Sequence, residues 1–277
     1  MSLPSATVVV PTRGRPEQLA RCVAALEDQD YPRERLEVLV IEDAEGAGPS
    51  AARNRGLAAA RGEVVAFTDD DCEPAPDWLR TLAEAWLADP GRGYGGTVLN
   101  ALEDDLAAEV AQRVIDAGYA HLNRPGDARF LSSNNLLFPT EALREIGGFE
   151  ESLRTAEDRD VCDRWRLSGR RLDHVPAAIV RHRHLGGVRE FWRQHVAYAR
   201  GSRRFHMLHR RRTGSRVRLE PGFYARLLRR PGRPRVRSDT LILMWLAACA
   251  YGYAAEVVRA GHGGDFMAGA GTAGTGR

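Results

Sequence analysis

Lysine is absent from this chain of 277 residues, and all 40 of its basic residues are arginine. The absence argues against a nucleotidyltransferase, because the glycine-rich N-terminal loop typical of those enzymes carries a lysine. Cysteine is scarce as well: the four residues stand far apart and form no Cys-x-x-Cys pair. This spacing argues against a zinc site and against a dense disulfide framework. We therefore expect the chain to fold in a reducing compartment.

Long apolar runs are also missing. Residues 241–255 form a stretch of 15 uncharged and largely apolar residues, whereas a helix needs roughly 20 to span a bilayer. The stretch predicts a helix that is packed or lies at an interface. No N-terminal segment combines a positive start, an apolar run and a small-residue cleavage site, so we expect no secretory signal. These two absences predict a cytoplasmic protein.

Positive charge is concentrated toward the C-terminal end. Residues 200–277 hold 16 of the arginines and only 4 of the 37 acidic residues. Residues 200–237 alone hold 14 arginines and one acid, Glu220, which leaves open a protein that binds nucleic acid or anionic lipid by charge. No nucleic-acid-binding motif accompanies these arginines. A basic segment before an apolar helix instead suits peripheral attachment to the inner face of a membrane, so we expect an anionic membrane surface as its partner.

The first half of the chain alternates apolar, β-branched runs with helix-like stretches, which is the pattern of an α/β protein with a mostly parallel sheet flanked by helices. The predicted strands are residues 7–11, 36–41 and 63–68. The predicted helices are residues 16–26, 49–60 and 76–87.

The second half is less regular. We expect strands at residues 94–100, 130–139 and 172–181, and helices at residues 104–119, 161–168 and from 188 onward. The domain organisation that follows has a first domain at residues 1–199, with a nucleotide-binding part at about 1–100 and an acceptor part at about 101–199. A basic helical extension is expected at residues 200–260 and a flexible, glycine-rich tail at 261–277.

Three consecutive carboxylates, Asp69, Asp70 and Asp71, follow the third predicted strand. Like charges this close raise each other's pKa unless a cation neutralises them. Oxygen ligands suit Mg²⁺ or Mn²⁺, which proteins usually hold with one or two carboxylates and substrate phosphates. The alternative is an acidic turn that faces solvent or caps the next helix. The position at a strand end favours the metal site, because ligands of open α/β sheets bind there.

Five motifs follow one another in the first 160 residues. They are VVVPTRGR at residues 8–15, AARNRGL at residues 51–57, the stretch from Gly62 to Cys72, GGF at residues 147–149, and Glu157-Asp158. In this order they resemble family 2 glycosyltransferases, over about residues 5–200. The resemblance implies a GT-A fold, which is Rossmann-like with a mixed, mostly parallel sheet. It also implies an enzyme that transfers a sugar from a nucleotide-diphosphate sugar to an acceptor hydroxyl with inversion.

The resemblance assigns most of the donor site. The residues that it places at the nucleotide are Pro11, Thr12, Arg13, Arg15, Asp43 and Arg53, with Glu42 as the less favoured partner of Asp43. Ordinary strand-to-helix turns are the alternative reading of these loops. Ser133, Asn134 and Asn135 match a segment that contacts donor sugar and acceptor, or they only close a turn.

The resemblance also assigns the metal and the base. Asp71 corresponds to the direct ligand of Mn²⁺ or Mg²⁺, Asp69 to a contact of ribose or metal-bound water, and Asp70 to the variable middle position. His182 stands where related enzymes place a histidine near the metal or diphosphate, although His184 would point to the same side of a strand. Glu157 and Asp158 match the family's acidic pair, with Asp158 as general base. Acids at a helix N-terminus would also explain that pair through the helix dipole.

The substrates are less defined by the sequence. A UDP-sugar donor is slightly preferred over a GDP-sugar, and a natural product, a glycan or a lipid-linked molecule each suits as acceptor. The QxxRW motif of processive relatives is not intact in residues 191–201, which disfavours polymerisation. Besides a nucleotidyltransferase and a charge-driven binding protein, a family member that binds nucleotide sugar without turnover remains an alternative, which the intact Asp71 and Asp158 disfavour.

Overall fold

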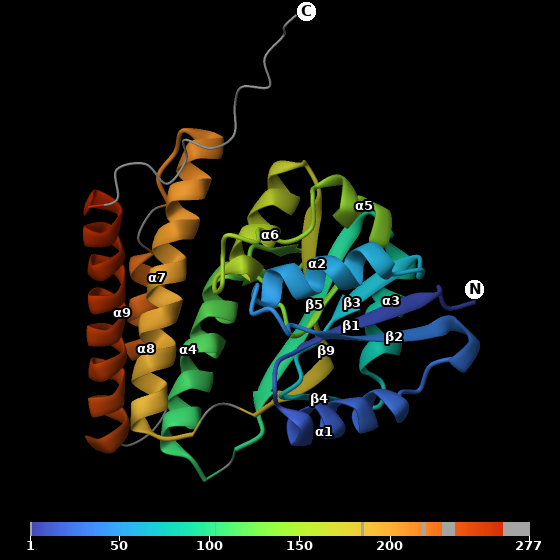
Figure 1. Ribbon diagram of the computed structural model, residues 1–277, viewed down its shortest axis with the longest axis horizontal. Coiled ribbons are helices and arrows are strands. Elements are labelled where there is room, and N and C mark those ends of the chain that lie inside the picture. The colour runs from blue at the N-terminus through green and yellow to red at the C-terminus, as the bar shows by residue number, and fades with distance from the viewer. Residues whose placement is uncertain (1, 103, 184–185, 218–219, 229–235, 263–277) are drawn as a thin grey trace, which may run out of the picture.

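The computed structural model describes residues 2–102, 104–183, 186–217, 220–228 and 236–262. Its centre is a mixed sheet of seven strands in the order β2-β1-β3-β8-β5-β9-β4. Helices cover both faces of this sheet, and a further layer of helices stands beside it (Figure 1). The N-terminal strands lie at one edge of the sheet, and the C-terminal helices form the layer beside it.

Three parallel strands form the N-terminal half of the sheet, as the apolar runs predicted. These strands are β1 (Ala6–Thr12), β2 (Leu36–Glu42) and β3 (Val64–Phe67), the second preceded by a short 3₁₀ helix (Arg33–Arg35). The intervening helices are α1 (Pro16–Glu27) and α2 (Pro49–Ala59), each with proline in the first turn, where the missing N–H costs nothing. The strand β1 is buried along its whole length because it lies between β2 and β3 and under helices on both faces.

The two faces of the sheet carry separate cores, because successive strand residues point to opposite sides. Val8 and Val10 pack with Val64 against α1 and against α3 (Trp78–Ala88). Val9 and Val65 pack on the other face, against α2, α5 (Thr140–Glu145) and α6 (Glu157–Leu167). The predicted strands and helices of the first half are therefore confirmed to within a few residues at each end.

The C-terminal half of the sheet contains both parallel and antiparallel pairs. Its strands are β4 (Cys72–Pro74), β5 (Arg92–Asn100), β8 (Leu136–Pro139) and β9 (Arg171–His182), with a separate hairpin β6 (Asn123–Arg124) and β7 (Asp127–Ala128). The strand β8 is antiparallel to both neighbours, whereas β5 and β9 are parallel. Five of the seven strands run in one direction, so the expected mixed and mostly parallel sheet is confirmed.

The prediction of a strand at residues 130–139 is wrong for residues 130–135. Residues 130–135 form a loop, in which the backbone N–H of Asn135 donates to the carbonyl of Ser132 at 3.0 Å. The Asn135 side chain accepts from Trp78 Nε1 at 2.8 Å and from the backbone of Gly96 at 3.1 Å. These bonds hold the loop across the sheet in a way that the apolar pattern alone does not reveal. The strand β8 begins only at Leu136.

Four helices form the layer beside the sheet. They are α4 (Leu106–Leu122), α7 (Val188–Thr213), α8 (Pro221–Leu228) and α9 (Val236–His262). Figure 1 shows α9, α7 and α4 side by side, and buried residues of α4, α7, α8 and α9 form one apolar cluster. The boundary expected at residue 199 falls inside α7, so the basic extension is continuous with the helix that precedes it. Most of the tail expected to be flexible, residues 263–277, lies outside the described residues.

One described helix, α9, is long and apolar enough to cross a membrane by length and composition, over Ser238–Ala260. In the most apolar 18-residue stretch of this helix, 33% is buried against the rest of the protein. The aliphatic side chains that face outward along it include Leu243 and Val257. The helix predicted at residues 241–255 is thus confirmed and is longer than expected.

A glycine sets the distance between α7 and the loop that precedes α6. A Cβ atom added to Gly201 would lie 2.1 Å from Thr155 Oγ1 and 2.4 Å from the Thr155 carbonyl oxygen. Because the second of these atoms is backbone, the clash cannot be relieved by a side-chain rotation. We expect Gly201→Ala to lower the free energy of unfolding by about 1–3 kcal/mol, the usual cost of overpacking. Urea denaturation followed by circular dichroism measures this change.

Gly118 in α4 provides the matched control. It is also a helix-interior glycine, but an added Cβ would meet only Phe223 at 4.0 Å. Gly118→Ala should therefore raise stability by about 0.5–1 kcal/mol, because alanine loses less backbone entropy in a helix. Equal effects of the two substitutions would show that helix propensity, and not the close approach of α7, governs position 201.

Candidate active site

The carboxyl ends of β1, β2 and β3 meet at one edge of the sheet, where ligands of α/β proteins bind. Thr12, Asp43 and the acidic triplet 69–71 lie at these ends because the three strands are parallel and in register. A cavity of about 1460 Å³ opens here and extends to the layer of α4, α7, α8 and α9. Except for Glu42, the nucleotide, metal and base residues predicted from the sequence line this cavity: Pro11, Thr12, Arg13, Arg15, Asp43, Arg53, Asp69, Asp70, Asp71, Asn134, Glu157, Asp158 and His182.

Two arginines neutralise the acidic triplet. Arg53 is buried and bridges two carboxylates, with Nη2 at 2.5 Å from Asp69 Oδ1 and Nη1 at 2.9 Å from Glu157 Oε1. Arg15 contacts the other two, with Nη1 at 3.2 Å from Asp70 Oδ1 and 2.8 Å from Asp71 Oδ2. Burial alone would lower the pKa of Arg53, but Asp69 and Glu157 outweigh it and raise that pKa. The repulsion inferred from the sequence is therefore relieved in part by the protein's own cations.

Asp70 has a defined structural place, although its middle position in the motif suggested variability. It is buried, and its Oδ2 accepts a hydrogen bond from Thr12 Oγ1 at 2.8 Å. Burial raises the pKa of Asp70, while the bond from Thr12 and the charge of Arg15 act in the opposite direction. Its contacts tie the end of β3 to the end of β1, and so Asp70 positions the loop that carries its two neighbours.

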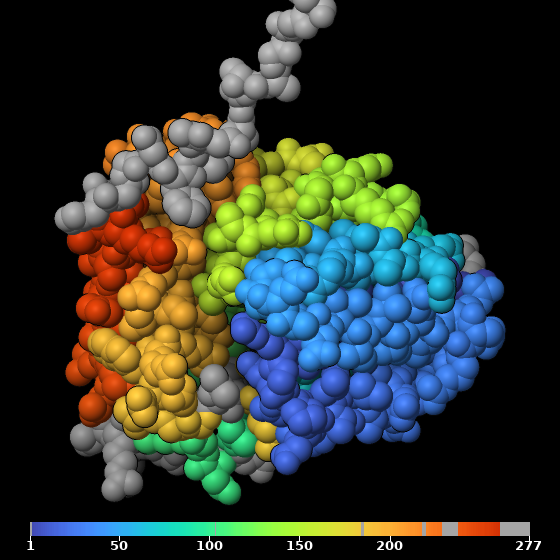
Figure 2. Space-filling view, in the orientation of Figure 1, coloured from blue at the N-terminus to red at the C-terminus, as the bar shows by residue number. Residues whose placement is uncertain are grey.

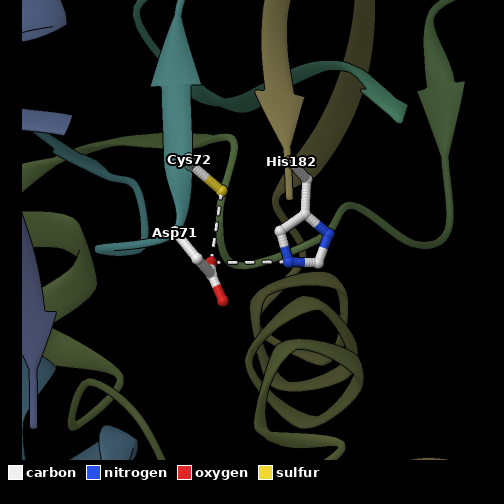
Figure 3. A group of neighbouring side chains, drawn as sticks. All are labelled: Asp71, Cys72 and His182. Atoms are coloured by element: carbon white, nitrogen blue, oxygen red, sulfur yellow. Dashed lines mark hydrogen bonds and ion pairs between the residues drawn. The ribbon is translucent and has the colours of Figure 1, made fainter. Parts of the chain in front are cut away.

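Asp71, in the turn before β4, and His182, at the end of β9, point toward one another (Figure 3). The pairing of β4 with β9 places Cys72 opposite His182 and so brings the histidine to the acidic triplet. His182 Nε2 lies 3.4 Å from Asp71 Oδ1, and the ligand atoms of Asp71, Cys72 and His182 lie within 4.8 Å of one another. Burial would raise the pKa of Asp71, but His182 and Arg15 outweigh it and lower that pKa. His184 lies outside the described residues.

The chemistry of these donors fits a divalent ion at Asp71 and His182. A carboxylate oxygen suits Mn²⁺ or Mg²⁺, and imidazole is a common additional ligand of transition metals. Cys72 is the poorer donor, because burial raises the pKa of its thiol well above the ordinary value and only the thiolate binds metal well. Asp69 is already held by Arg53, so it reaches such an ion only if that pair rearranges.

The helix α6 begins at the acidic pair, four residues earlier than predicted. Its N-cap is Ala156, whose φ of 66° makes it the only described residue other than glycine in the left-handed region. Such backbone conformations cost about 1–3 kcal/mol and cluster at functional sites. Glu157 is engaged by Arg53 and accepts from Ser133 Oγ at 3.4 Å. Asp158 faces the cavity, where burial and the neighbouring charge of Glu157 raise its pKa to about 7.

Where β1 and β2 end, the cavity has one buried acceptor without a hydrogen bond and two arginines without an ion pair among the described residues. Asp43 Oδ2 accepts from the Gly48 backbone at 2.9 Å, but its Oδ1 is buried and without a hydrogen-bond partner among the described residues. Arg13 and Arg154 line the same end and form no ion pair with any described residue. Glu42 is exposed and does not line the cavity, because neighbouring strand residues point in opposite directions.

The segment 133–135 divides between the cavity and the core. Ser133 and Asn134 line the cavity, and Asn134 Oδ1 is buried with no hydrogen-bond partner among the described residues. Asn135 does not line it, since its side chain is fully used in bonds to the sheet backbone and Trp78. The structure thus places Ser133 and Asn134 at the site, whereas Asn135 stabilises the fold.

The other end of the cavity is an apolar space that the sequence analysis did not predict. We call the helical chamber that part of the cavity lined by α4, α7, α8 and α9. In Figure 2 the surface of α7 and α9 lies beside that of the α/β part. Arg154, Arg159 and Tyr198 are further cavity residues absent from the sequence predictions. Tyr198 comes from α7, Arg154 from the loop before α6, and Arg159 from α6, where its contacts with Ser202 and Phe205 place it at the border of the helical chamber. Only tertiary packing brings these segments together, and no short motif in the sequence signals this.

Comparison with known proteins identifies the family of the chain. Residues 44–147 match the profile described as "Glycosyl transferase family 2". The chain is similar to the Pre-mycofactocin glycosyltransferase of Mycobacterium tuberculosis, with 30% identity over 220 residues that cover 71% of this chain and 46% of that protein. It is also similar to glycosyltransferase AglE of Haloferax volcanii, with 29% identity that covers 28% of this chain and 34% of that protein. The chain thus spans less than half the length of these curated relatives.

Solved structures show the same fold. The mannosyltransferase PcManGT of Pyrobaculum calidifontis, solved with GDP-Man and Mn²⁺, superposes with a TM-score of 0.60 at 21% identity, covering 96% of this chain and 77% of that one. TarS of S. aureus superposes with a TM-score of 0.51 at 18% identity, covering 91% and 54%. The ordered motifs, the acidic edge of the sheet and these similarities together show that the chain belongs to glycosyl transferase family 2 and has the GT-A fold.

Proposed function

We propose that this protein transfers a sugar from a nucleotide-diphosphate sugar to an acceptor hydroxyl, with metal assistance and inversion at the anomeric carbon. The observation that carries the proposal is the single cavity that contains both the triplet Asp69–Asp71 and Asp158, whose pKa of about 7 suits a general base. The family shown above is a glycosyltransferase family, and two structural neighbours were solved with a nucleotide or nucleotide sugar and Mn²⁺.

The nucleotide would bind where the cavity offers partners for its polar groups. The buried Oδ1 of Asp43 can accept a hydrogen bond from the base or ribose, which would remove the cost of an unsatisfied carboxylate oxygen. Arg13 and Arg154 would bind the diphosphate, because an unpaired guanidinium forms strong bidentate bonds with phosphate oxygens. Asn134 Oδ1 can accept from a hydroxyl of the donor sugar.

Asp71 and His182 would hold the divalent ion. When bound, Mn²⁺ or Mg²⁺ supplies positive charge that offsets the charge developing on the leaving diphosphate. Arg15 shares Asp71 in the structure and keeps that carboxylate oriented toward the cavity. Arg53 holds Asp69 and Glu157 on either side of the site and so fixes the distance between the donor end and the base.

The transfer itself is a single displacement. A carboxylate oxygen of Asp158 takes the proton of the acceptor hydroxyl as that oxygen forms its bond to the anomeric carbon. The bond from the same carbon to the diphosphate oxygen breaks on the opposite face, and its electron pair leaves with the nucleoside diphosphate. The product therefore has the inverted anomeric configuration. Arg53 and Glu157 keep the start of α6, and with it Asp158, at a fixed place during this step.

The basic helices provide weaker support for a charge-driven binding function. Several of their arginines are used inside the protein: Arg204 lies 2.7 Å from the buried Glu256, and Arg212 Nη1 lies 2.5 Å from the buried Asp160. These pairs attach α7 to α9 and α6, so their charges are not available as a nucleic-acid surface. Peripheral attachment of a cytoplasmic protein through the exposed face of α9 stays a proposal, which pelleting with anionic liposomes at low and high salt would test.

Nucleotide binding gives the first test of the function. With UDP or GDP at about 100 times the dissociation constant, the folded state should gain about 2.7 kcal/mol, which raises the melting temperature by about 5–10 °C for a protein of this size. We expect the larger part of this shift to require Mn²⁺. Asp71→Asn should remove the Mn²⁺-dependent part, because it removes the charge that holds the ion. Differential scanning fluorimetry with each nucleotide measures the shift and identifies the base.

Asp77→Asn is the control for this experiment. Asp77 carries the same side chain six residues away, is exposed, and lies outside the cavity. Its substitution should leave both shifts as in the unaltered protein. A melting temperature that no nucleoside diphosphate changes, with or without Mn²⁺, would contradict a nucleotide-sugar donor. Release of pyrophosphate in place of nucleoside diphosphate during turnover would support a nucleotidyltransferase instead.

A further inference from the structure

The helical chamber opens from the same cavity as the donor site, but its walls are of a different kind. Six of its apolar residues come from three helices: Val114, Ile115, Phe223, Trp245, Leu246 and Cys249. Pockets for a single ligand usually measure about 300–1,000 Å³, so a cavity of about 1460 Å³ has room for a donor and a second molecule. An apolar space of this size beside a reacting centre suits the apolar body of an acceptor, because burying apolar surface drives binding.

One arginine at the border of this chamber forms no close ion pair with any described residue. Arg159 lines the cavity directly after Asp158, and its guanidinium forms no ion pair with any described residue. It is held in place by Ser202 Oγ, 3.3 Å from its Nη1, and by the ring of Phe205, whose centre lies 5.6 Å from its Cζ. Burial lowers the pKa of Arg159 despite the charge of Asp158, so a partly buried guanidinium with no close ion pair is costly, and an anionic ligand would reduce that cost.

The other ionisable groups of the chamber do not balance Arg159. Glu220 is the chamber's acid among the described residues, and it already contacts His121 at 2.9 Å and Arg129 at 3.2 Å. His206 also faces the chamber, and burial together with the charge of Arg159 lowers its pKa to about 4, so it is neutral near pH 7. The charge of Asp158 acts on Arg159 and offsets part of the cost of burying it, but as the proposed base Asp158 must be free to accept a proton.

We propose that the acceptor is an apolar hydroxylated anion, whose hydrophobic body fills the helical chamber and whose carboxylate or phosphate binds Arg159. This rests on the function proposed above, because it is Asp158 that fixes where the reacting hydroxyl lies. Arg159 then acts as a specificity-determining residue: it places the acceptor's anionic group beside the base, so that the hydroxyl is oriented before transfer. Neutral acceptors of the same shape bind more weakly.

Two fluorescent probes that differ by one charge test this proposal. 8-Anilinonaphthalene-1-sulfonate has two aromatic groups and a sulfonate, whereas N-phenyl-1-naphthylamine has the same rings and no charge. Both are titrated in the presence of UDP and Mn²⁺, so that the donor end is not available to the sulfonate. Arg159→Met should weaken binding of the sulfonate about 10- to 100-fold, as expected for loss of a hydrogen-bonded charge, and change binding of the neutral probe less than twofold.

Three further variants complete the test. Arg159→Lys should retain most of the sulfonate affinity, which separates loss of charge from damage to the fold. Arg203→Met is the matched control. Arg203 also packs on an aromatic ring, with its Cζ 5.7 Å from the centre of the Tyr253 ring, but it does not line the cavity. Trp245→Ala should weaken both probes. Unchanged sulfonate binding in Arg159→Met, or unchanged binding of both probes in Trp245→Ala, would overturn the proposal.

Competition identifies the anionic group. Displacement of the sulfonate probe by dodecanoate indicates a carboxylate acceptor, displacement by dodecyl phosphate indicates a phosphate, and displacement by neither contradicts the proposal. Failure of the proposed function would look different. In that case UDP and GDP would not change the melting temperature in Mn²⁺, while the probes would still report on the chamber through Arg159 and Trp245.

Discussion

Asp158→Asn is expected to lower the turnover number for sugar transfer about 10²- to 10⁴-fold, the range typical for loss of a general base. The amide keeps the size of the side chain but cannot take a proton from the acceptor hydroxyl. Nucleotide binding should persist, because Asp158 belongs to the start of α6 and not to the ends of β1 and β2 that would hold the nucleotide. Initial rates with saturating donor, together with nucleotide titrations, measure both effects. Transfer at an unaltered rate would remove Asp158 as the base.

The pH dependence gives an independent check. The pKa of Asp158 is raised to about 7, so the carboxylate is mostly protonated at pH 6 and mostly ionised at pH 8. Since only the ionised form accepts a proton, the turnover number should rise about tenfold per pH unit below pH 7 and level off above about pH 8. The residual activity of Asp158→Asn should lack this rise. A profile that is flat between pH 5.5 and 8 in the unaltered protein would contradict the assignment.

Stability should move in the opposite direction to activity. The folded state holds the proton of Asp158 more tightly than an unfolded aspartate of ordinary pKa near 3.8, so this group makes folding less favourable as the pH rises from about 4 to 7. Asp158→Asn removes the buried charge and should therefore raise the melting temperature at pH 8. Asp163→Asn on the same helix is the control: Asp163 pairs with His209 at 2.8 Å and lies outside the cavity.

Arg53→Leu should have the largest effect on stability, lowering the free energy of unfolding by about 3–5 kcal/mol. Its side chain is only 3% exposed and lies between Asp69 and Glu157, so its removal leaves two carboxylates facing each other without a cation. Removal of one partner from a buried ion pair typically costs this much. Urea denaturation at pH 7.5 and at pH 5 measures the loss, which should be smaller at the lower pH as the freed carboxylates take up protons.

Arg55→Leu separates this effect from the general loss of an arginine in α2. Arg55 is exposed, and its Nη2 donates to the carbonyl oxygen of Glu42 at 2.8 Å. Substitutions at such surface positions usually change stability by no more than about 0.5 kcal/mol. If Arg53→Leu lowered the free energy of unfolding no more than Arg55→Leu, then the bridge that Arg53 forms between Asp69 and Glu157 would not be what holds the acidic triplet to α6.

Much of the N-terminal half could be predicted from the sequence, because local signals there agree with the fold. Apolar runs gave β1, β2 and β3, and proline in the first turn marked α1 and α2. The acidic triplet indicated a need for positive charge, but the sequence could not show which groups supply it. Arg53 comes from α2 and Arg15 from the loop after β1, and only the parallel arrangement of the strands brings them to Asp69 and Asp71.

The second half was harder to predict because long-range packing overrides its local pattern. Residues 130–135 directly precede the apolar strand 136–139 and were predicted as its first part, yet Asn135 uses its whole side chain to bridge Trp78 and the sheet backbone, which requires a loop. Helix α6 starts at Glu157 because Ala156 turns the chain in a left-handed conformation that alanine rarely adopts. The helical chamber depends on residues up to about 140 positions apart, and no periodicity within one helix reveals it.

The contact of Gly201 with Thr155 limits how this protein could be redesigned for new acceptors. Because α7 packs closely on the loop that leads into α6, we expect any substitution that pushes α7 outward to shift Asp158, the proposed base, as well. Libraries that vary α7 would therefore lose activity together with selectivity. The chamber walls contributed by α4 and α8 belong to other helices, and they are the places where directed evolution could reshape the proposed acceptor space while the chemistry is kept.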